Sequence, residues 1–63
     1  MNNTQAMQKI KQDIMKEQDC TNDQAVRYIA DLLSRSRLTV YDWLSINRPE
    51  IPDQLLELLR LKL

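Results

Sequence analysis

The sequence has no glycine, no histidine and no phenylalanine, and its only cysteine is Cys20. With no histidine and one cysteine, the chain can neither assemble a zinc site of Cys and His ligands nor close a disulfide within itself. The missing glycine excludes glycine-rich phosphate-binding loops and obliges turns to use Asn, Ser or Pro. We therefore expect no metal, no cofactor and a fold that is held together by helix packing.

The length of 63 residues lies near the lower limit at which one hydrophobic core can hold a fold. We expect a single domain over 1–63, with association between chains as a further source of stability. The N-terminus is polar, and no apolar stretch approaches the length of a membrane span. These features lead us to expect a cytoplasmic protein with no membrane partner.

The charges balance, since nine basic and nine acidic residues give a net charge of zero. Proteins that bind nucleic acids are often clearly basic. A neutral chain can still carry a basic face, but the balance predicts only modest non-specific affinity for DNA at physiological salt.

The apolar residues recur at steps of three and four, which is the period of an α-helix. The first stripe, on a helix from Thr4 to about Lys16, consists of Met7, Ile10 and Ile14. Thr21 is a good N-cap for a second helix, and Gln24 completes a capping box. This second helix should end near Ser34, where a polar break begins.

A third helix should start at Ser36, which can cap it, and run to about Ser45. The rotation of roughly 100° per residue divides this helix into two faces. The face expected to point inward carries Val40, Trp43 and Leu44. The face expected to point outward carries Leu38, Tyr41, Asp42 and Ser45.

The two prolines, Pro49 and Pro52, prevent the third helix from continuing. Pro52 suits the first turn of a fourth helix over about 52–62, with Asp53 beside its positive N-terminal end. The fold class that follows is all-α, a compact domain of four to five helices.

A helix-turn-helix requires a small residue where two helices approach, a short polar turn and apolar residues facing the core from both helices. The stretch 21–45 meets these requirements, and it resembles the helix-turn-helix of the lambda-repressor-like family, which includes phage Cro proteins and Xre-type regulators. The resemblance extends over roughly 21–59. It is carried by Ala30 as the small residue, Ser36-Arg37 at the turn and helix start, Thr39-Val40-Tyr41, Trp43, and the proline-containing Arg48-Pro49 and Ile51-Pro52.

The sequence departs from the family at the turn. The family usually has glycine where this chain has Ser34, and an apolar residue where it has Arg35. The family's glycine after the recognition helix corresponds to Ile46, and Asn47 could adopt the left-handed conformation instead. The capping box at Thr21 also makes the second helix about one turn longer than usual.

The resemblance implies a small sequence-specific DNA-binding transcriptional regulator of the phage Cro or repressor type, with the helix at 36–45 in the major groove. Base contacts are expected from Arg37, Leu38, Tyr41, Asp42 and Ser45. Backbone contacts are expected from Arg35, Ser36, Arg48 and Arg27. Asp42 has two interpretations, because its carboxylate can accept from a cytosine amino group or repel phosphate.

The fourth helix has more leucines than a small core requires, which suggests a homodimer on a palindromic DNA site. The interface is expected at Leu56, Leu59, Leu61 and Leu63. A protein-interaction module on the same fold, such as an antirepressor or a phage-encoded inhibitor of a host protein, is the alternative. Neutral net charge, Asp42 and the surplus leucines favour it.

An enzyme is not expected, because the sequence offers no metal ligands, no nucleophile with a base and no phosphate loop. The acidic residues Asp19 and Asp23 lie at a helix start, where capping is their expected role. The chain is also too small to enclose a pocket for a small-molecule substrate comfortably.

Overall fold

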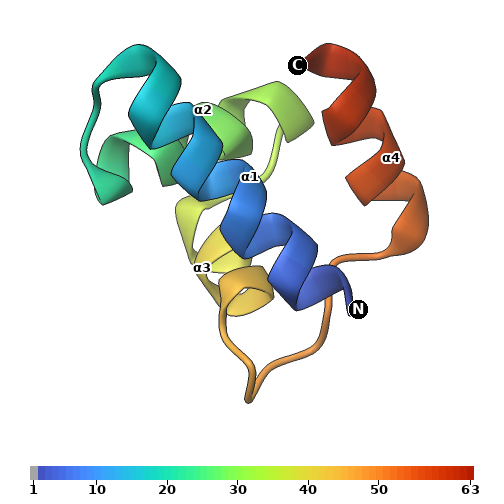
Figure 1. Cartoon of the computed structure of the whole chain (residues 1–63). Helices are drawn as coiled ribbons and strands as arrows, with labels where there is room; N and C mark the ends of the chain where they lie inside the picture. Colours follow the sequence, from blue (N-terminus) through green and yellow to red (C-terminus); the bar gives the residue numbers. More distant parts are fainter. Residues whose placement is uncertain (1) are drawn as a thin grey trace.

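The computed structural model describes residues 2–63, and in this part of the chain it contains four helices and no strand. Figure 1 shows their arrangement. The helices are α1 (Asn3–Gln18), α2 (Asn22–Leu33), α3 (Arg37–Leu44) and α4 (Asp53–Lys62). The all-α class is therefore confirmed. None of these helices is both long and apolar enough to cross a membrane.

The helices begin where the sequence provides caps. Thr21 accepts a hydrogen bond from the Gln24 backbone, and the Gln24 side chain accepts one from the Thr21 backbone, which completes the predicted capping box. The Ser36 hydroxyl likewise accepts from the Thr39 backbone N–H at 3.2 Å, so α3 starts as predicted. Pro52 lies just before α4 instead of inside its first turn.

The connection from α2 to α3 is a Schellman turn made without glycine. Ser34 adopts the left-handed conformation, with φ 54° and ψ 43°. Its N–H donates to the Asp31 carbonyl, and the Arg35 N–H donates to the Ala30 carbonyl at 2.9 Å, which is the bonding pattern of this motif. Ser34 thus takes the position that glycine occupies in most such turns.

The end of α3 differs from expectation. Within residues 2–63 the non-glycine positions with positive φ are Asp19 and Ser34, so the idea that Asn47 becomes left-handed is wrong. Instead, Ser45 leaves the helix in an extended conformation, with φ −94° and ψ 132°. The loop then turns through the Arg48 N–H, which donates to the Ser45 carbonyl.

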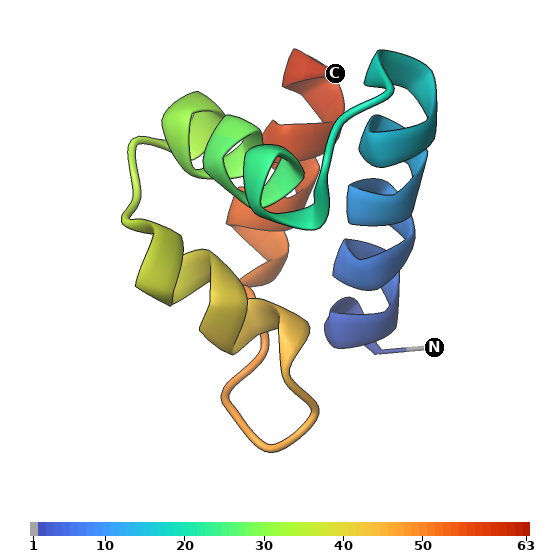
Figure 2. The ribbon, with the colours of Figure 1, turned by 90° about the vertical axis from the view of Figure 1, so that its left-hand side faces the viewer.

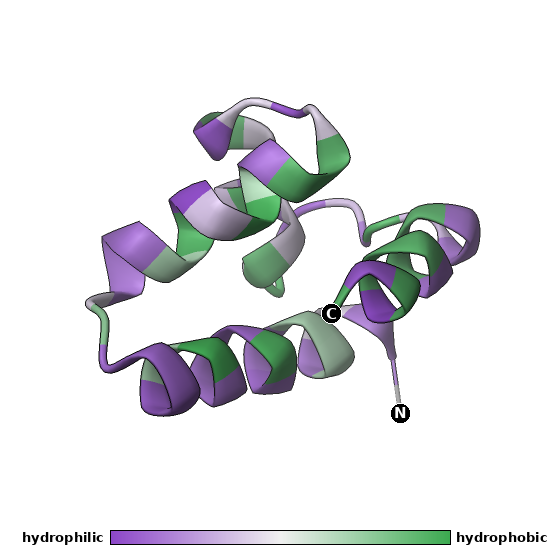
Figure 3. Cartoon of the chain, turned by 90° about the horizontal axis from the view of Figure 1, so that it is seen from above, coloured by the Kyte–Doolittle hydropathy of each residue, from purple (hydrophilic) through white to green (hydrophobic). Residues whose placement is uncertain are grey.

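The core is formed between α1 and α2, each of which packs against the other three helices, whereas α3 and α4 do not contact each other. Figure 3 shows apolar residues of α1 on the side turned toward the other helices. The buried apolar residues are Met7, Ile14, Ala25, Val26, Ile29, Ala30, Leu33, Val40, Trp43, Ile51, Leu56 and Leu59.

Polar contacts from α1 fix the ends of α3 and α4. The Gln8 side chain donates to the Leu44 carbonyl at 3.0 Å, which ties the last turn of α3 to α1. The Asn3 amide donates to the Ile51 carbonyl and to the Asp53 carboxylate. α1 therefore serves as the support on which both C-terminal helices are placed.

Candidate nucleic-acid interface

The two sides of α3 are sharply divided by burial. Val40 is fully buried and Trp43 is 8% exposed, whereas Leu38 is 78% and Tyr41 39% exposed. This distribution confirms the predicted orientation, with the aliphatic and indole side inward and Leu38 and Tyr41 outward. Figure 2 shows α3 below the short turn that joins it to α2, and this turn lies on the side away from α1. The outer face of α3 is therefore open to a ligand.

The N-terminal end of α3 is also exposed. Arg35, Ser36 and Arg37 all lie at the surface. The first turn of a helix has unpaired N–H groups and a partial positive charge, and the two arginines add full charges beside it. The Ser36 hydroxyl is engaged by the Thr39 backbone and lies 2.9 Å from the Thr39 hydroxyl. This end of α3 can attract an anion such as a phosphate.

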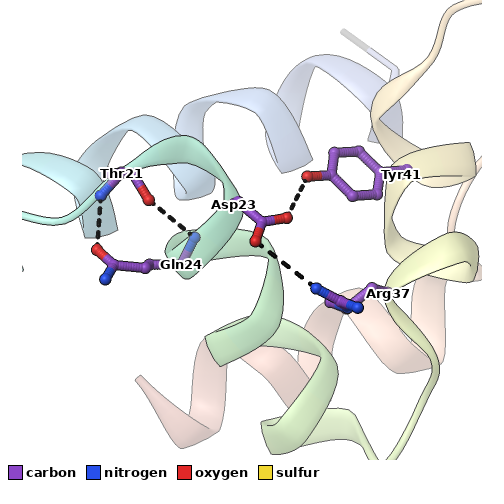
Figure 4. A network of polar contacts seen from close by, with 5 residues as sticks. All are labelled: Thr21, Asp23, Gln24, Arg37 and Tyr41. Atoms are coloured by element: carbon purple, nitrogen blue, oxygen red, sulfur yellow. Dashed lines mark hydrogen bonds and ion pairs between the residues drawn. The ribbon is translucent and has the colours of Figure 1, made fainter.

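A carboxylate from α2 lies on the outer face of α3. The Tyr41 hydroxyl donates to Asp23 Oδ1 at 2.7 Å, and Arg37 Nη1 lies 3.6 Å from Asp23 Oδ2 (Figure 4). This hydrogen bond to Asp23, together with desolvation and the negative charge of Asp23, raises the pKa of Tyr41 above 10.0, while Arg37 opposes the shift. Asp23 thus belongs to the candidate interface. The expectation that Asp19 and Asp23 cap a helix start is wrong, because Thr21 caps α2 and Asp19 ends α1 in the left-handed conformation.

A second exposed ion pair lies at the other end of α3. Arg48 Nε is 3.9 Å from Asp42 Oδ1, and both side chains are more than half exposed. An isolated exposed pair such as Arg48–Asp42 contributes about 0–1 kcal/mol, so it opens easily when a stronger partner arrives. Asp42 and Asp23 nevertheless each balance one arginine of the surface.

The remaining predicted contact residues are placed unequally. Arg27 and Arg35 are exposed, and within residues 2–63 neither forms an ion pair. Ser45 is only partly exposed, and its hydroxyl lies 3.4 Å from the Asn47 backbone N–H that donates to it. Ser45 is therefore the least accessible of the five predicted base-contacting residues.

The leucines of α4 separate into two groups. Leu56 and Leu59 are buried in the core of a single chain, which corrects their assignment to a subunit interface, because their side chains are already covered. Leu61 is 80% exposed, and Leu58 and Leu63 are also at the surface. The sequence pattern identifies the leucines of this segment, but it does not predict which of them are buried in the core of a single chain.

The described residues form no pocket and no group of potential metal ligands. What the surface offers instead is a short capped helix that presents Arg37, Leu38 and Tyr41, with Arg35 and Arg48 in the segments beside it. Comparisons with protein-family models, curated proteins and solved structures found no match to this chain. Its function is therefore inferred from its own residues.

Proposed function

We propose that this protein is a small sequence-specific DNA-binding regulator, in which α2, the turn at 34–36 and α3 act as a helix-turn-helix of the lambda-repressor-like type. The observation that carries the proposal is the open face of α3, where Arg37, Leu38 and Tyr41 are exposed while Trp43 is held in the core. A helix of eight residues is roughly 12 Å long. The major groove of DNA is wide enough to admit such a helix.

The exposed side chains have the chemistry that base recognition requires. Arg37 can donate two hydrogen bonds to guanine, and Leu38 can contact a thymine methyl group. Tyr41 and Ser45 offer hydroxyl groups, and Asp42 can accept from cytosine. Ala30 supports the geometry, because it is buried at the small-residue position of α2, one turn before the Schellman turn.

Contacts to the DNA backbone would come from the residues around α3. Arg35 and Ser36 lie in the turn before α3, and Arg48 lies in the loop after it. Arg27 is an exposed candidate on α2. Such contacts set the position of the protein on the duplex and carry no sequence information themselves. A regulator of this type acts in the cytoplasm, a compartment that the single cysteine also suits.

Selection of bound sequences from random duplex DNA tests the proposal, and we expect a short, palindromic motif. Arg37→Ala should then weaken binding to that motif by roughly 1–3 kcal/mol. The matched control is Arg60→Ala, which removes the same charge from the exposed surface of α4 and should affect binding far less. Equal affinity of the parent and Arg37→Ala would remove Arg37 from the site.

The homodimer is part of this proposal. An antiparallel pair of α4 helices related by a twofold axis would bring Leu58 of one copy to Leu61 of the other. The same pairing would bring Glu57 of one copy to Lys62 of the other, so that opposite charges flank the apolar centre. The twofold axis would present two α3 helices to the two halves of a palindromic site.

Sedimentation at high micromolar concentration tests the dimer. We expect the parent to be a dimer and Leu61→Glu to be a monomer, because the new carboxylate would be buried without a partner. Leu38→Glu introduces the same charge at an equally exposed leucine of α3 and should stay dimeric. A monomeric parent would end this part of the proposal.

A protein-interaction module remains the second candidate, and one observation favours it. The carboxylates of Asp23 and Asp42 each pair with an arginine, so the outer face of α3 is partly neutral and less attractive to phosphates. No enriched duplex in the selection, together with a stable stoichiometric complex with a cellular protein, would support this second function.

A further inference from the structure

The first turn of α2 brings an acidic residue, Asp23, against the outer face of α3. Asp23 lies in the first turn of α2, two residues after the Thr21 cap, and it is 18 residues before Tyr41 in the chain. Its two carboxylate oxygens have different partners, the Tyr41 hydroxyl at 2.7 Å and the Arg37 guanidinium at 3.6 Å (Figure 4). Arg37 and Tyr41 are one helical turn apart, so one carboxylate spans the reading side of α3.

We propose that Asp23 is a positioning residue that sets the base specificity of α3, an inference that rests on the proposed DNA-binding function. Asp23 would hold the Arg37 side chain in the orientation that reads a guanine. It would also hold the Tyr41 ring beside it. Asp23 itself would contact no base.

The geometry of the guanidinium allows Arg37 to contact Asp23 and a guanine at the same time. An arginine has five N–H donors in a rigid planar fork, and the contact with Asp23 involves one of its terminal nitrogens, Nη1. The remaining donors stay free for the O6 and N7 atoms of guanine. Because the carboxylate already orders the long side chain, less rotamer entropy is lost when the base contact forms.

The charge of Asp23 acts in the same direction. An isolated arginine on the surface attracts any phosphate, and that attraction is independent of sequence. Asp23 offsets the positive charge of Arg37, so Arg37 contributes little affinity for a duplex through phosphates alone. A guanine placed opposite the free donors of Arg37 still accepts their hydrogen bonds. Asp23 therefore lowers non-specific affinity and raises the ratio of specific to non-specific affinity.

The test compares Asp23→Asn with Asp31→Asn. Both variants lose one negative charge from an exposed position of α2, but within residues 2–63 the Asp31 side chain, unlike that of Asp23, forms no hydrogen bond or ion pair with α3. Binding to the selected duplex and to a scrambled duplex of the same length is measured for the parent and for both variants. Both variants should bind the scrambled duplex more tightly than the parent, because each has gained net positive charge.

The ratio of specific to non-specific affinity separates positioning from charge. In Asp23→Asn we expect this ratio to fall by about tenfold, within the range by which one good arginine–guanine contact discriminates. In Asp31→Asn the fall should be much smaller. A ratio that falls equally in both variants, or in neither, would overturn the proposal about Asp23. The DNA-binding function would still stand in that case, provided that the parent prefers its selected duplex. A parent with no preferred duplex would overturn both.

A second readout needs no DNA. Spectrophotometric titration in a Tyr28→Phe background follows the Tyr41 phenol alone, since the chain has two tyrosines. Asp23→Asn should lower the pKa of Tyr41 toward 10.0, and Asp31→Asn should leave it unchanged. If Asp23→Asn does not move this titration, the carboxylate does not hold Tyr41 in solution, and the positioning role is overturned even if DNA affinity changes.

Discussion

The two faces of α3 are held by forces of different strength. The inner face is fixed by burial of Val40 and Trp43, and full burial of one large apolar side chain contributes roughly 1.5–3 kcal/mol. The outer face is organised by two exposed ion pairs, each of which contributes about 0–1 kcal/mol, and by one hydrogen bond of the Tyr41 hydroxyl at the surface. The direction in which α3 faces is therefore robust, whereas the atoms that it offers to a ligand depend on weak contacts.

The largest expected effect tests the inner face. Trp43→Ala should lower the free energy of unfolding by about 3–5 kcal/mol, because it removes a large buried ring and leaves a cavity. Leu38→Ala, on the outer face of the same helix, should change it by about 0.5 kcal/mol or less. Urea unfolding measures both. Similar losses in the two variants would contradict the division between the faces.

The next effect concerns the residue that starts α3. Ser36→Ala removes the hydroxyl that accepts from the Thr39 backbone and should lower the free energy of unfolding by about 1 kcal/mol. Ser45→Ala is the comparison at the other end of α3, where the hydroxyl accepts one long hydrogen bond at 3.4 Å, and it should lose less. Equal losses would mean that the cap at Ser36 does not stabilise the start of α3.

The helices and their ends could largely be predicted from sequence, because they depend on local signals. The capping box at Thr21 and the cap at Ser36 involve residues three apart in the chain. The inward turn of Trp43 followed from helical periodicity. Ile51 shows where such signals stop, because it is buried although it belongs to no helix and no periodic stripe.

The details of the candidate site could not be predicted in the same way, because they depend on contacts between helices. The contact of Asp23 with Tyr41 joins residues 18 apart and exists only once α2 and α3 are packed. The burial of Leu56 and Leu59 likewise depends on which side of α4 meets α1 and α2. Periodicity identifies an apolar face, but it does not distinguish a core from an interface.

A smaller effect, of opposite sign, concerns the turn that aims α3. Ser34 has a positive φ, which is unfavourable for a residue with a Cβ atom. Ser34→Gly should therefore raise the free energy of unfolding by about 0.5–1 kcal/mol. Asn47→Gly is the control, because Asn47 is not left-handed and glycine gains nothing there. If Asn47→Gly raises the free energy of unfolding as much as Ser34→Gly does, relief of the positive φ at Ser34 is not the source of the added stability.

The smallest effect belongs to the outer face and appears as a dependence on pH. The hydrogen bond to Asp23 raises the pKa of Tyr41 above 10.0, so the folded chain keeps this proton at a pH where the unfolded chain has lost it. The resulting stability is fully present below the unfolded pKa and is lost as pH rises through the folded pKa. The useful quantity is the difference between the parent and Tyr41→Phe, because the variant lacks the phenolic proton of Tyr41 and keeps every other titratable group. Urea unfolding at pH values below and above the ordinary tyrosine pKa should show that the free energy of unfolding falls more steeply in the parent than in Tyr41→Phe. If the free energy of unfolding depends on pH equally in the parent and in Tyr41→Phe, the Asp23 carboxylate does not hold Tyr41 in solution. The orientation of α3 would then depend on the buried residues of its inner face alone.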